Sequence, residues 1–215
     1  MTDTPSGLHP AAFTRANNDP DPEFYAGRSD STQMDAGART AVTALYQTAL
    51  PASGVILDLM AGTLSHLPEE SAHDTVIGLD VNGAALEANK SLTQRVVQDI
   101  NEKPRIDLPD SSLDAVCLCD GFAYLTDPVA ILTEINRLLR PGAPLIVTFS
   151  DNFIPQKAVA LWQALEPADR TRLITLLLDR AGLTDLDTGE VVPPEDLTAW
   201  NDTVHAVIGR KKLTA

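Results

Sequence analysis

Short apolar runs alternate with longer amphipathic stretches from residue 54 onward. Five of the runs have the length of buried strands and are rich in Val, Ile and Leu. They lie at 55–57, 75–79, 95–97, 113–119 and 144–149. A weaker run at 183–186 and a final one at 204–208 bring the predicted strands to seven.

Helical spacing of apolar residues fills several of the intervals. Val42 and Leu45 belong to a helix that ends near Pro51, and further helices are predicted at 156–165 and 168–181. The clearest helix follows the fourth strand: Asp127 can cap it, Pro128 suits its first turn, and the Pro-Gly pair at 141–142 stops it.

Alternating strands and helices are typical of parallel strands joined by right-handed crossovers. The sequence therefore predicts an α/β fold with a doubly wound, mostly parallel seven-stranded sheet. Residues 36–215 are predicted to form a single domain. Residues 1–35 contain four prolines and few apolar side chains, so they are expected to form an N-terminal arm.

The net charge of the chain disfavours some classes of binding partner. The 215 residues carry 16 Lys and Arg against 30 Asp and Glu, a net charge of −14. Such an acidic chain repels phosphate backbones and anionic lipid, so we expect neither nucleic acid nor a membrane as partner. No apolar run approaches the about 20 residues of a membrane span, and residues 1–25 do not resemble a secretory signal.

The cysteines and histidines indicate neither a disulfide framework nor a metal site. Cys117 and Cys119 lie two apart in an apolar run, which favours buried thiols and a reducing, cytoplasmic location. The four histidines lack the spacing of metal ligands, so we expect no metal.

Acidic residues follow three successive strands: Asp58, Asp80 and Asp99. In open parallel sheets, ligands bind beyond the carboxyl ends of the strands, where a carboxylate can accept hydrogen bonds from a ribose diol. Each aspartate taken singly could instead be a turn residue or helix cap. The loop after the first strand holds one glycine, Gly62, so the glycine-rich cradle for a pyrophosphate is missing.

Five segments in order resemble the motifs of class I S-adenosylmethionine-dependent methyltransferases. They are 56–63, 76–80, 97–100, 108–116 and 138–143, within a similarity that covers about residues 40–150. The chain is most similar to the small-molecule branch that contains ubiquinone/menaquinone C-methyltransferase-like enzymes. Met60 and Leu64 replace the usual first and third glycines of the first motif.

The resemblance implies a Rossmann-like methyltransferase fold with S-adenosylmethionine as cofactor. Asp80 would bind the ribose hydroxyls and Asp99 the adenine amine, while Ile100 packs on the adenine. Asp120 and Gly121 would border both cofactor and substrate. The complete expected cofactor site is Asp58, Ala61, Gly62, Asp80, Val81, Asp99, Ile100, Asp120 and Gly121.

No residue is identified as catalytic, because methyl transfer needs a general base only when the acceptor must lose a proton. His66 and Tyr124 are the candidates, although the position of His66 after the first-motif loop favours a pocket-lining or capping role. Phe122, Tyr124 and Asp151 follow the fourth and fifth strands, where substrate walls form. Core packing is the alternative for the two aromatic residues, and capping is the alternative for Asp151.

The arm has two interpretations of its own. Tyr25, with Arg28, could fold over the cofactor as a lid and exclude water. A partly disordered extension is the alternative.

The sequence is compatible with two functions, one of an enzyme and one of a binding protein. The first is methyl transfer from S-adenosylmethionine to a small-molecule acceptor. The second is a non-catalytic protein that retains the fold and binds S-adenosylmethionine or S-adenosylhomocysteine, which the substitutions Met60 and Leu64 suggest. The acceptor, the methylated atom and the oligomeric state stay open.

Overall fold

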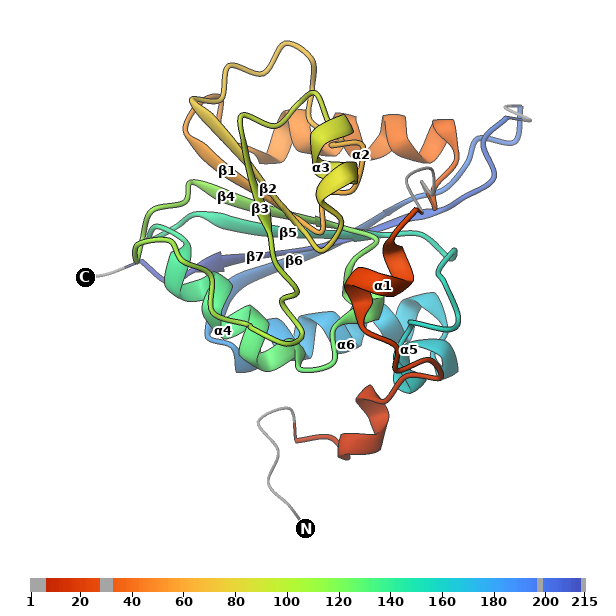
Figure 1. The fold of residues 1–215 in the computed structure, drawn as a ribbon. Helices are drawn as coiled ribbons and strands as arrows, with labels where there is room; N and C mark the ends of the chain where they lie inside the picture. Colours follow the sequence, from red (N-terminus) through yellow and green to blue (C-terminus); the bar gives the residue numbers. More distant parts are fainter. Residues whose placement is uncertain (1–6, 28–32, 197–198, 214–215) are drawn as a thin grey trace.

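A seven-stranded sheet forms the centre of the molecule (Figure 1). The computed structural model describes residues 7–27, 33–196 and 199–213. The sheet has the order β3-β2-β1-β4-β5-β7-β6, and β1 to β5 are parallel while β7 is antiparallel to both neighbours. The strands are β1 Val55–Leu59, β2 Thr75–Asp80, β3 Gln94–Val97, β4 Ala115–Cys119, β5 Pro144–Phe149, β6 Leu183–Val191 and β7 Val204–Lys211. The predicted doubly wound, mostly parallel sheet of seven strands is confirmed.

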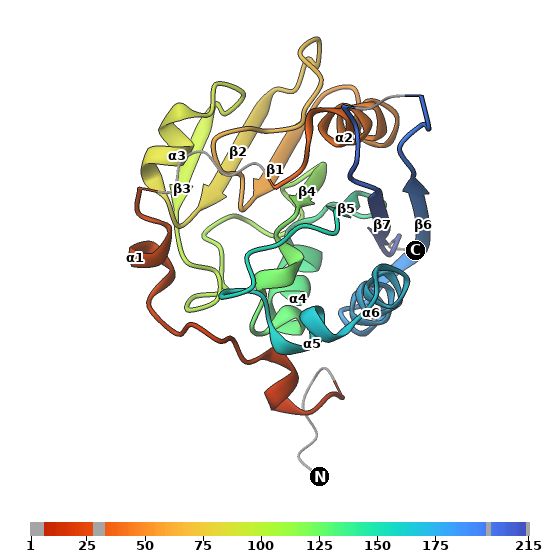
Figure 2. The same cartoon turned by 90° about the vertical axis from the view of Figure 1, so that its right-hand side faces the viewer.

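Helices cover both faces of the sheet (Figure 2). On one face, α2 (Ala36–Ala49) buries Val42 and Tyr46 against Ile56 and Cys117, and α3 (Gly83–Ala88) packs Leu86 nearby. The opposite face holds the larger apolar core beneath α4 (Pro128–Leu138), α5 (Ala160–Ala164) and α6 (Pro167–Arg180). Because side chains alternate along a strand, one apolar run supplies both cores.

Helix α4 forms as its sequence predicts. The Asp127 side chain accepts a hydrogen bond from the backbone N–H of Ala130 at 3.1 Å, and Pro128 occupies the first turn. Ile131, Leu132 and Ile135 are fully buried against the sheet. None of the helices in the described residues is long and apolar enough to cross a membrane.

The crossovers differ from the predicted alternation of strand and helix. The described residues that join β1 to β2 and β3 to β4 contain no helix. In the first of these connections, Pro68 has no backbone N–H to donate to a helix. Its carbonyl oxygen accepts a hydrogen bond from Ser71 N–H at 3.0 Å, which forms a turn. The carboxyl end of β1 therefore continues into an irregular loop rather than a helix.

The predicted helix at 156–165 is shorter than expected, because α5 begins only at Ala160. Two backbone hydrogen bonds hold the preceding segment in another conformation: Val159 N–H donates to Ala123 O, and Ala160 N–H donates to Thr14 O, each at 2.9 Å. Tertiary contacts thus override the local helical pattern. The last two strands exceed their predicted lengths, and a register shift in β6 falls between Thr184 and Asp187.

The N-terminal arm contains η1 (Pro10–Phe13), which packs against α5, and α1 (Asp21–Tyr25), which lies beside the carboxyl ends of the parallel strands (Figures 1 and 2). Backbone hydrogen bonds tie it to the segment before α5, for example Asn17 N–H to Gln156 O at 2.9 Å. The arm also approaches η2 (Phe122–Tyr124), the short helix after β4. Arg28, the expected partner of Tyr25, lies outside the described residues.

Candidate functional site

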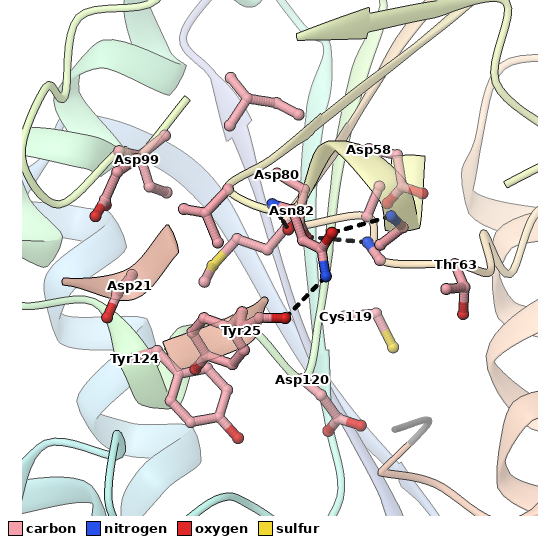
Figure 3. Close-up of a pocket in the computed structure, with 18 of the residues that line it drawn as sticks. Asp21, Tyr25, Asp58, Thr63, Asp80, Asn82, Asp99, Cys119, Asp120 and Tyr124 are labelled. Atoms are coloured by element: carbon pink, nitrogen blue, oxygen red, sulfur yellow. Dashed lines mark hydrogen bonds between the residues drawn. The ribbon is translucent and has the colours of Figure 1, made fainter. Parts of the chain in front are cut away.

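One cavity lies at the carboxyl ends of β1, β2 and β4 and beneath the arm (Figure 3). It is lined by all nine residues that the resemblance assigns to the cofactor. Three further candidates also line it: Tyr25, His66 and Tyr124. These side chains come from elements far apart in the sequence, and the parallel sheet brings them together because its strand ends meet at one edge.

Asp58 ends β1 at the floor of the cavity. Only 6% of it is exposed, and its Oδ2 accepts a hydrogen bond from the Ser65 hydroxyl at 2.5 Å. Burial raises the pKa of Asp58 to about 7 against the opposing effect of Ser65, and the nearby charge of Asp80 raises it further. Asp58 is thus a carboxyl group close to its protonation midpoint at neutral pH.

Met60 begins the loop after β1 in a left-handed conformation, with φ at 58°. Glycine adopts such a backbone conformation without strain, whereas methionine rarely does. The substitution of the first-motif glycine has therefore left a glycine-like backbone conformation in place. Leu64, at the other substituted position, also lines the cavity and is 44% exposed.

Asp80 ends β2 with both carboxylate oxygens oriented by backbone donors. Oδ2 accepts from Gly62 N–H at 3.1 Å, and Oδ1 accepts from Asn82 N–H at 2.8 Å. Burial raises the pKa of Asp80 even though these hydrogen bonds oppose the shift. The loop after β1 is thereby fixed against the end of β2, with lone pairs on Asp80 remaining for a ligand.

Asn82 joins this strand end to the arm. Its Oδ1 caps α3 by accepting from the N–H groups of Ala84 and Ala85, each at 3.1 Å. Its Nδ2 donates to the carbonyl oxygen of Tyr25 at 2.9 Å (Figure 3). One side chain therefore holds α1 across the cavity from β2.

Asp99 follows β3 and turns the chain there, because its Oδ1 accepts from Asn101 N–H at 2.9 Å. Asn101 Nδ2 in turn donates to Asp21 of the arm at 3.3 Å. Between them, Ile100 is 2% exposed and still lines the cavity. An apolar wall and a carboxylate thus stand side by side, as an adenine ring and its amine would require.

Asp120 follows β4 in a left-handed conformation, with φ at 52°. Its Oδ1 accepts from Ser150 N–H at 2.9 Å. Burial raises the pKa of Asp120 to about 7, against the hydrogen bonds from Ser150, and Asp202 adds to the rise. The next position requires glycine, since a Cβ on Gly121 would lie 2.4 Å from Leu118 Cδ1.

The two candidates for a general base differ from Asp120 in their protonation chemistry. Burial, aided by the positive charge of Arg39, lowers the pKa of His66 to about 4, so its imidazole is neutral at pH 7. Tyr124 donates its hydroxyl hydrogen to Gln33 Oε1 at 2.7 Å and accepts from Ile154 N–H at 2.9 Å. Burial raises the pKa of Tyr124 well above its usual value, so it stays a phenol.

A buried ionic cluster anchors the arm. Asp21 Oδ1 lies 2.7 Å from Arg15 Nη1 and 2.8 Å from Lys157 Nζ, and Lys157 is fully buried. Burial alone would raise the pKa of Asp21, but the hydrogen bonds from the two cations lower it overall. Nearby, the buried Tyr25 hydroxyl has no hydrogen-bond partner among the described residues, although Tyr25 lines the cavity.

Two predicted substrate residues lie away from the cavity lining. Phe122 is 3% exposed in the core, with its ring centroid 6.0 Å from that of Trp162. Asp151 points to solvent, with 55% of its side chain exposed, and its Oδ1 lies 3.8 Å from Arg170 Nη1. Core packing, the alternative for Phe122, describes its position. Asp151 does not fill its alternative role as a helix cap, because the next helix, α5, begins only at Ala160.

The structure adds lining residues that the sequence reasoning did not propose. They are Asp21, Gln33, Thr63, Asn82, Gln98, Asn101, Cys119 and Ile154. Asn82 could have been found, because it follows the predicted ribose-binding aspartate and precedes a helix. Gln98 and Asn101 flank the Asp99 motif. Asp21 and Gln33 carry no sequence signal for a site, because only the folded arm brings them there.

The cavity fits a nucleoside cofactor better than a metal. A Cβ on Gly62 would meet no heavy atom within 4 Å, so there is open space beside the loop. The unpartnered Tyr25 hydroxyl and the carboxylates of Asp80 and Asp99 offer hydrogen-bonding groups around that space. Among the described residues, no group of three or more His, Cys, Asp or Glu side chains could hold a metal ion.

Comparison with known protein families identifies a methyltransferase domain at residues 57–147. Two curated relatives are demethylmenaquinone methyltransferases. The chain is 34% identical to that of Lactiplantibacillus plantarum over 112 residues, which cover 47% of each protein. It is 25% identical to that of Paenarthrobacter aurescens over 152 residues, which cover 70% of this chain and 57% of the relative. The matches thus span about half the length of these relatives.

Solved structures with a similar fold have low sequence identity. The crystal structure of the [4+2]-cyclase SpnF matches with a TM-score of 0.63 and 16% identity, covering 89% of this chain and 92% of that one. A SAM-dependent methyltransferase from Archaeoglobus fulgidus matches with a TM-score of 0.61 and 14% identity, covering 89% and 100%. At such identities the comparison establishes the fold alone.

Proposed function

We propose that this chain, whose residues 57–147 match the methyltransferase domain family, is a class I S-adenosylmethionine-dependent methyltransferase that transfers a methyl group to a small-molecule acceptor. One observation carries the proposal: Asp58, Asp80 and Asp99, which lie at or just past the carboxyl ends of three parallel strands, line a single cavity. Each of them could be an ordinary turn residue alone, but their convergence provides the polar contacts of an adenosyl group.

The cofactor of the family is S-adenosylmethionine, which supplies a methyl group on a sulfonium centre. We assign the ribose hydroxyls to Asp80, whose oxygens are already oriented by Gly62 and Asn82. We assign the adenine to Asp99 and Ile100, and the methionine part to the backbone at Ala61 and Gly62. Preorganised contacts of this kind position the reactants, which is a large part of the catalysis of displacement reactions.

The arm and the charge both favour a small acceptor. Asp21, Tyr25 and Gln33 close one side of the cavity, which leaves little access for a macromolecule. The net charge of −14 opposes binding of nucleic acid. A cytoplasmic location stays a prediction, supported by the free thiols of Cys117 and Cys119.

A non-catalytic binding protein is the second candidate function, and the two substituted glycines favour it. Met60 and Leu64 place side chains at the cavity where the family has none. The same fold also occurs in a [4+2]-cyclase, so the fold alone does not define the reaction.

Calorimetric titration with S-adenosylmethionine and S-adenosylhomocysteine tests the cofactor site. We expect binding by the wild type and an about 10- to 100-fold weaker affinity for Asp80→Ala, since hydrogen bonds to a charged group are lost. Asp74→Ala is the matched control, because Asp74 is exposed at the opposite end of β2. Absence of binding by the wild type at millimolar ligand would contradict the proposal.

Turnover separates the two functions. Transfer of a radiolabelled methyl group from S-adenosylmethionine to members of a panel of small acceptors would support the methyltransferase. Tight binding of both ligands without transfer to any acceptor would instead support the binding protein.

A further inference from the structure

We propose that Asp120 is the general base of this site, and that the acceptor is an uncharged molecule whose attacking atom carries a proton. This inference rests on the proposed methyltransferase function. It concerns a residue that the sequence assigned to the cofactor site, where that site borders the substrate. Four observations support it: the backbone conformation, the anchoring of one carboxylate oxygen, the surroundings of the other, and the unsuitability of the other candidates.

The backbone holds Asp120 in a costly conformation at the cavity. A φ of 52° is uncommon outside glycine, although Asn and Asp adopt it more readily than other residues. The Asp120 N–H donates to Thr148 O at 2.8 Å, which keeps the residue in line with the end of β5. Strained residues that the surrounding structure holds in place gather at functional sites.

The two oxygens of the carboxylate have different surroundings. Oδ1 is fixed by Ser150, which donates its N–H at 2.9 Å and its hydroxyl at 3.4 Å. Within the described part of the chain, no group donates a hydrogen bond to Oδ2. Asp120 lines the cavity together with Cys119 and Tyr124, as Figure 3 shows. The free oxygen is thus available to a group bound in the cavity.

The charges around Asp120 suit proton transfer near neutral pH. Burial, with Asp202 as the nearby acid, raises the pKa of Asp120 to about 7. The other titratable neighbours are uncharged, because burial also raises the pKa of Cys119 and of Tyr124. A base is most effective when its pKa lies near the working pH.

The alternatives are less suitable. His66, with its pKa lowered to about 4, has little affinity for a proton at pH 7. The Tyr124 hydroxyl already makes two hydrogen bonds, to Gln33 and from Ile154. Tyr124 is therefore a positioning residue for the wall of the cavity rather than a proton acceptor.

The proposed reaction combines removal of a proton from the acceptor with transfer of the methyl group. Asp120 takes the proton from the O–H or S–H of the acceptor, and the electron pair left on that oxygen or sulfur forms the new bond to the methyl carbon. The bond between this carbon and the sulfonium sulfur breaks, and its electron pair stays on sulfur as the neutral thioether. The Asp120 carboxyl group then returns its proton to water.

The charge of the cavity disfavours anionic acceptors. Five carboxyl groups line it, and that of Asp21 is paired with Arg15 and Lys157. The other four, from Asp58, Asp80, Asp99 and Asp120, have no Lys or Arg of the described residues beside them in the lining. An acceptor that arrived as an anion would meet this negative field in a poorly solvated site. An uncharged acceptor enters freely and becomes a nucleophile only when Asp120 removes its proton.

Asp120→Asn tests the proposal with little structural disturbance. Asparagine also tolerates the left-handed conformation, and its side-chain oxygen can accept from Ser150. We choose 1,4-dihydroxynaphthalene and benzyl mercaptan as probes, because each is uncharged at neutral pH and carries an O–H or S–H that a base can remove. We expect transfer to fall by about 100-fold or more in the variant, the usual contribution of a general base. Asp74→Asn removes the same charge far from the site and should leave transfer unchanged.

The pH profile and a direct titration separate a base from a structural residue. Wild-type transfer should rise through about pH 7 to a plateau as Asp120 loses its proton, and the variant should lack this rise. Carboxyl NMR of the protein without cofactor should show two titrations near pH 7, from Asp58 and Asp120, and only the one from Asp58 should remain in Asp120→Asn. The same set of titrations near pH 7 in the variant as in the wild type, or an unchanged pH profile in the variant, would overturn the proposal.

Binding measured in parallel distinguishes failure of this inference from failure of the proposed function. S-adenosylhomocysteine should still bind Asp120→Asn, because the variant retains the proposed cofactor contacts at Asp80 and Asp99. A wild type that binds the cofactor but methylates neither probe overturns the acceptor class alone. A wild type that binds no cofactor overturns the methyltransferase itself.

Discussion

At the scale of single residues, burial changes the acid–base chemistry of the cavity. Asp58 and Asp120 both have their pKa raised to about 7, while that of His66 falls to about 4. The common cause is desolvation, which disfavours the charged form of either kind of group. The residue types alone would suggest a histidine base and two ionised aspartates, whereas their environments reverse this assignment.

Asp58→Asn should stabilise the protein, and more so at high pH. The raised pKa means that the folded state binds a proton more tightly than the unfolded chain, so stability falls as pH rises from about 4 to about 7. Removing the carboxylate removes this penalty, worth on the order of 1–3 kcal/mol at pH 8. Urea unfolding at pH 5.5 and pH 8 measures the gain in the free energy of unfolding, with Asp74→Asn as the control. An equal gain at both pH values would contradict the prediction.

At the scale of elements, the arm is an ordered part of the site. Asp21 of α1 pairs with Arg15 and the fully buried Lys157, and Asn82 donates to the Tyr25 carbonyl. These contacts join α1 to the end of β2 and to the segment that precedes α5. We propose that the arm acts as a lid over the cofactor, held by this ionic cluster.

Asp21→Ala should release the arm, because it leaves Lys157 buried without its partner, which costs about 3 kcal/mol or more. Chymotrypsin cleavage after Phe24 and Tyr25 should accelerate at least about tenfold. Glu23→Gln removes an exposed charge from the same helix and should leave cleavage unchanged. Cofactor should slow cleavage of the wild type, and equal cleavage with and without it would contradict the lid.

At the scale of the whole molecule, the excess of acidic residues is also found in the lining of the cavity. The net charge is −14, and four of the five lining aspartates, all but the ion-paired Asp21, have no lining cation beside them in the described residues. S-adenosylmethionine carries one more positive charge than S-adenosylhomocysteine. The field of the protein should therefore favour the methyl donor over the product.

Salt should weaken this preference. Between about 0.05 M and about 0.5 M NaCl, screening shortens the reach of exposed charges to a few ångströms. We expect the Kd of S-adenosylmethionine to rise several-fold, and that of S-adenosylhomocysteine to change less than about twofold. Calorimetry with both ligands provides the comparison, and equal salt dependence would show that the net charge has no part in selection.

The sequence by itself determined the sheet, its strand ends and the order of the motifs. These follow from local periodicity and from residues next to one another in the chain, as Asp127 and Pro128 at the start of α4 show. The same local logic predicted that Asp58, Asp80 and Asp99 would share one edge, because parallel strands end together.

Only the tertiary structure decided which side chains face the cavity and how they titrate. Phe122 turned into the core and Asp151 to solvent, although both follow strand ends. Asp21 entered the cavity because α1 folds back onto it. Burial and long-range contacts set these outcomes and the protonation of Asp120. The position of Asp21 depends on a residue more than a hundred positions away, Lys157, with which it forms an ion pair.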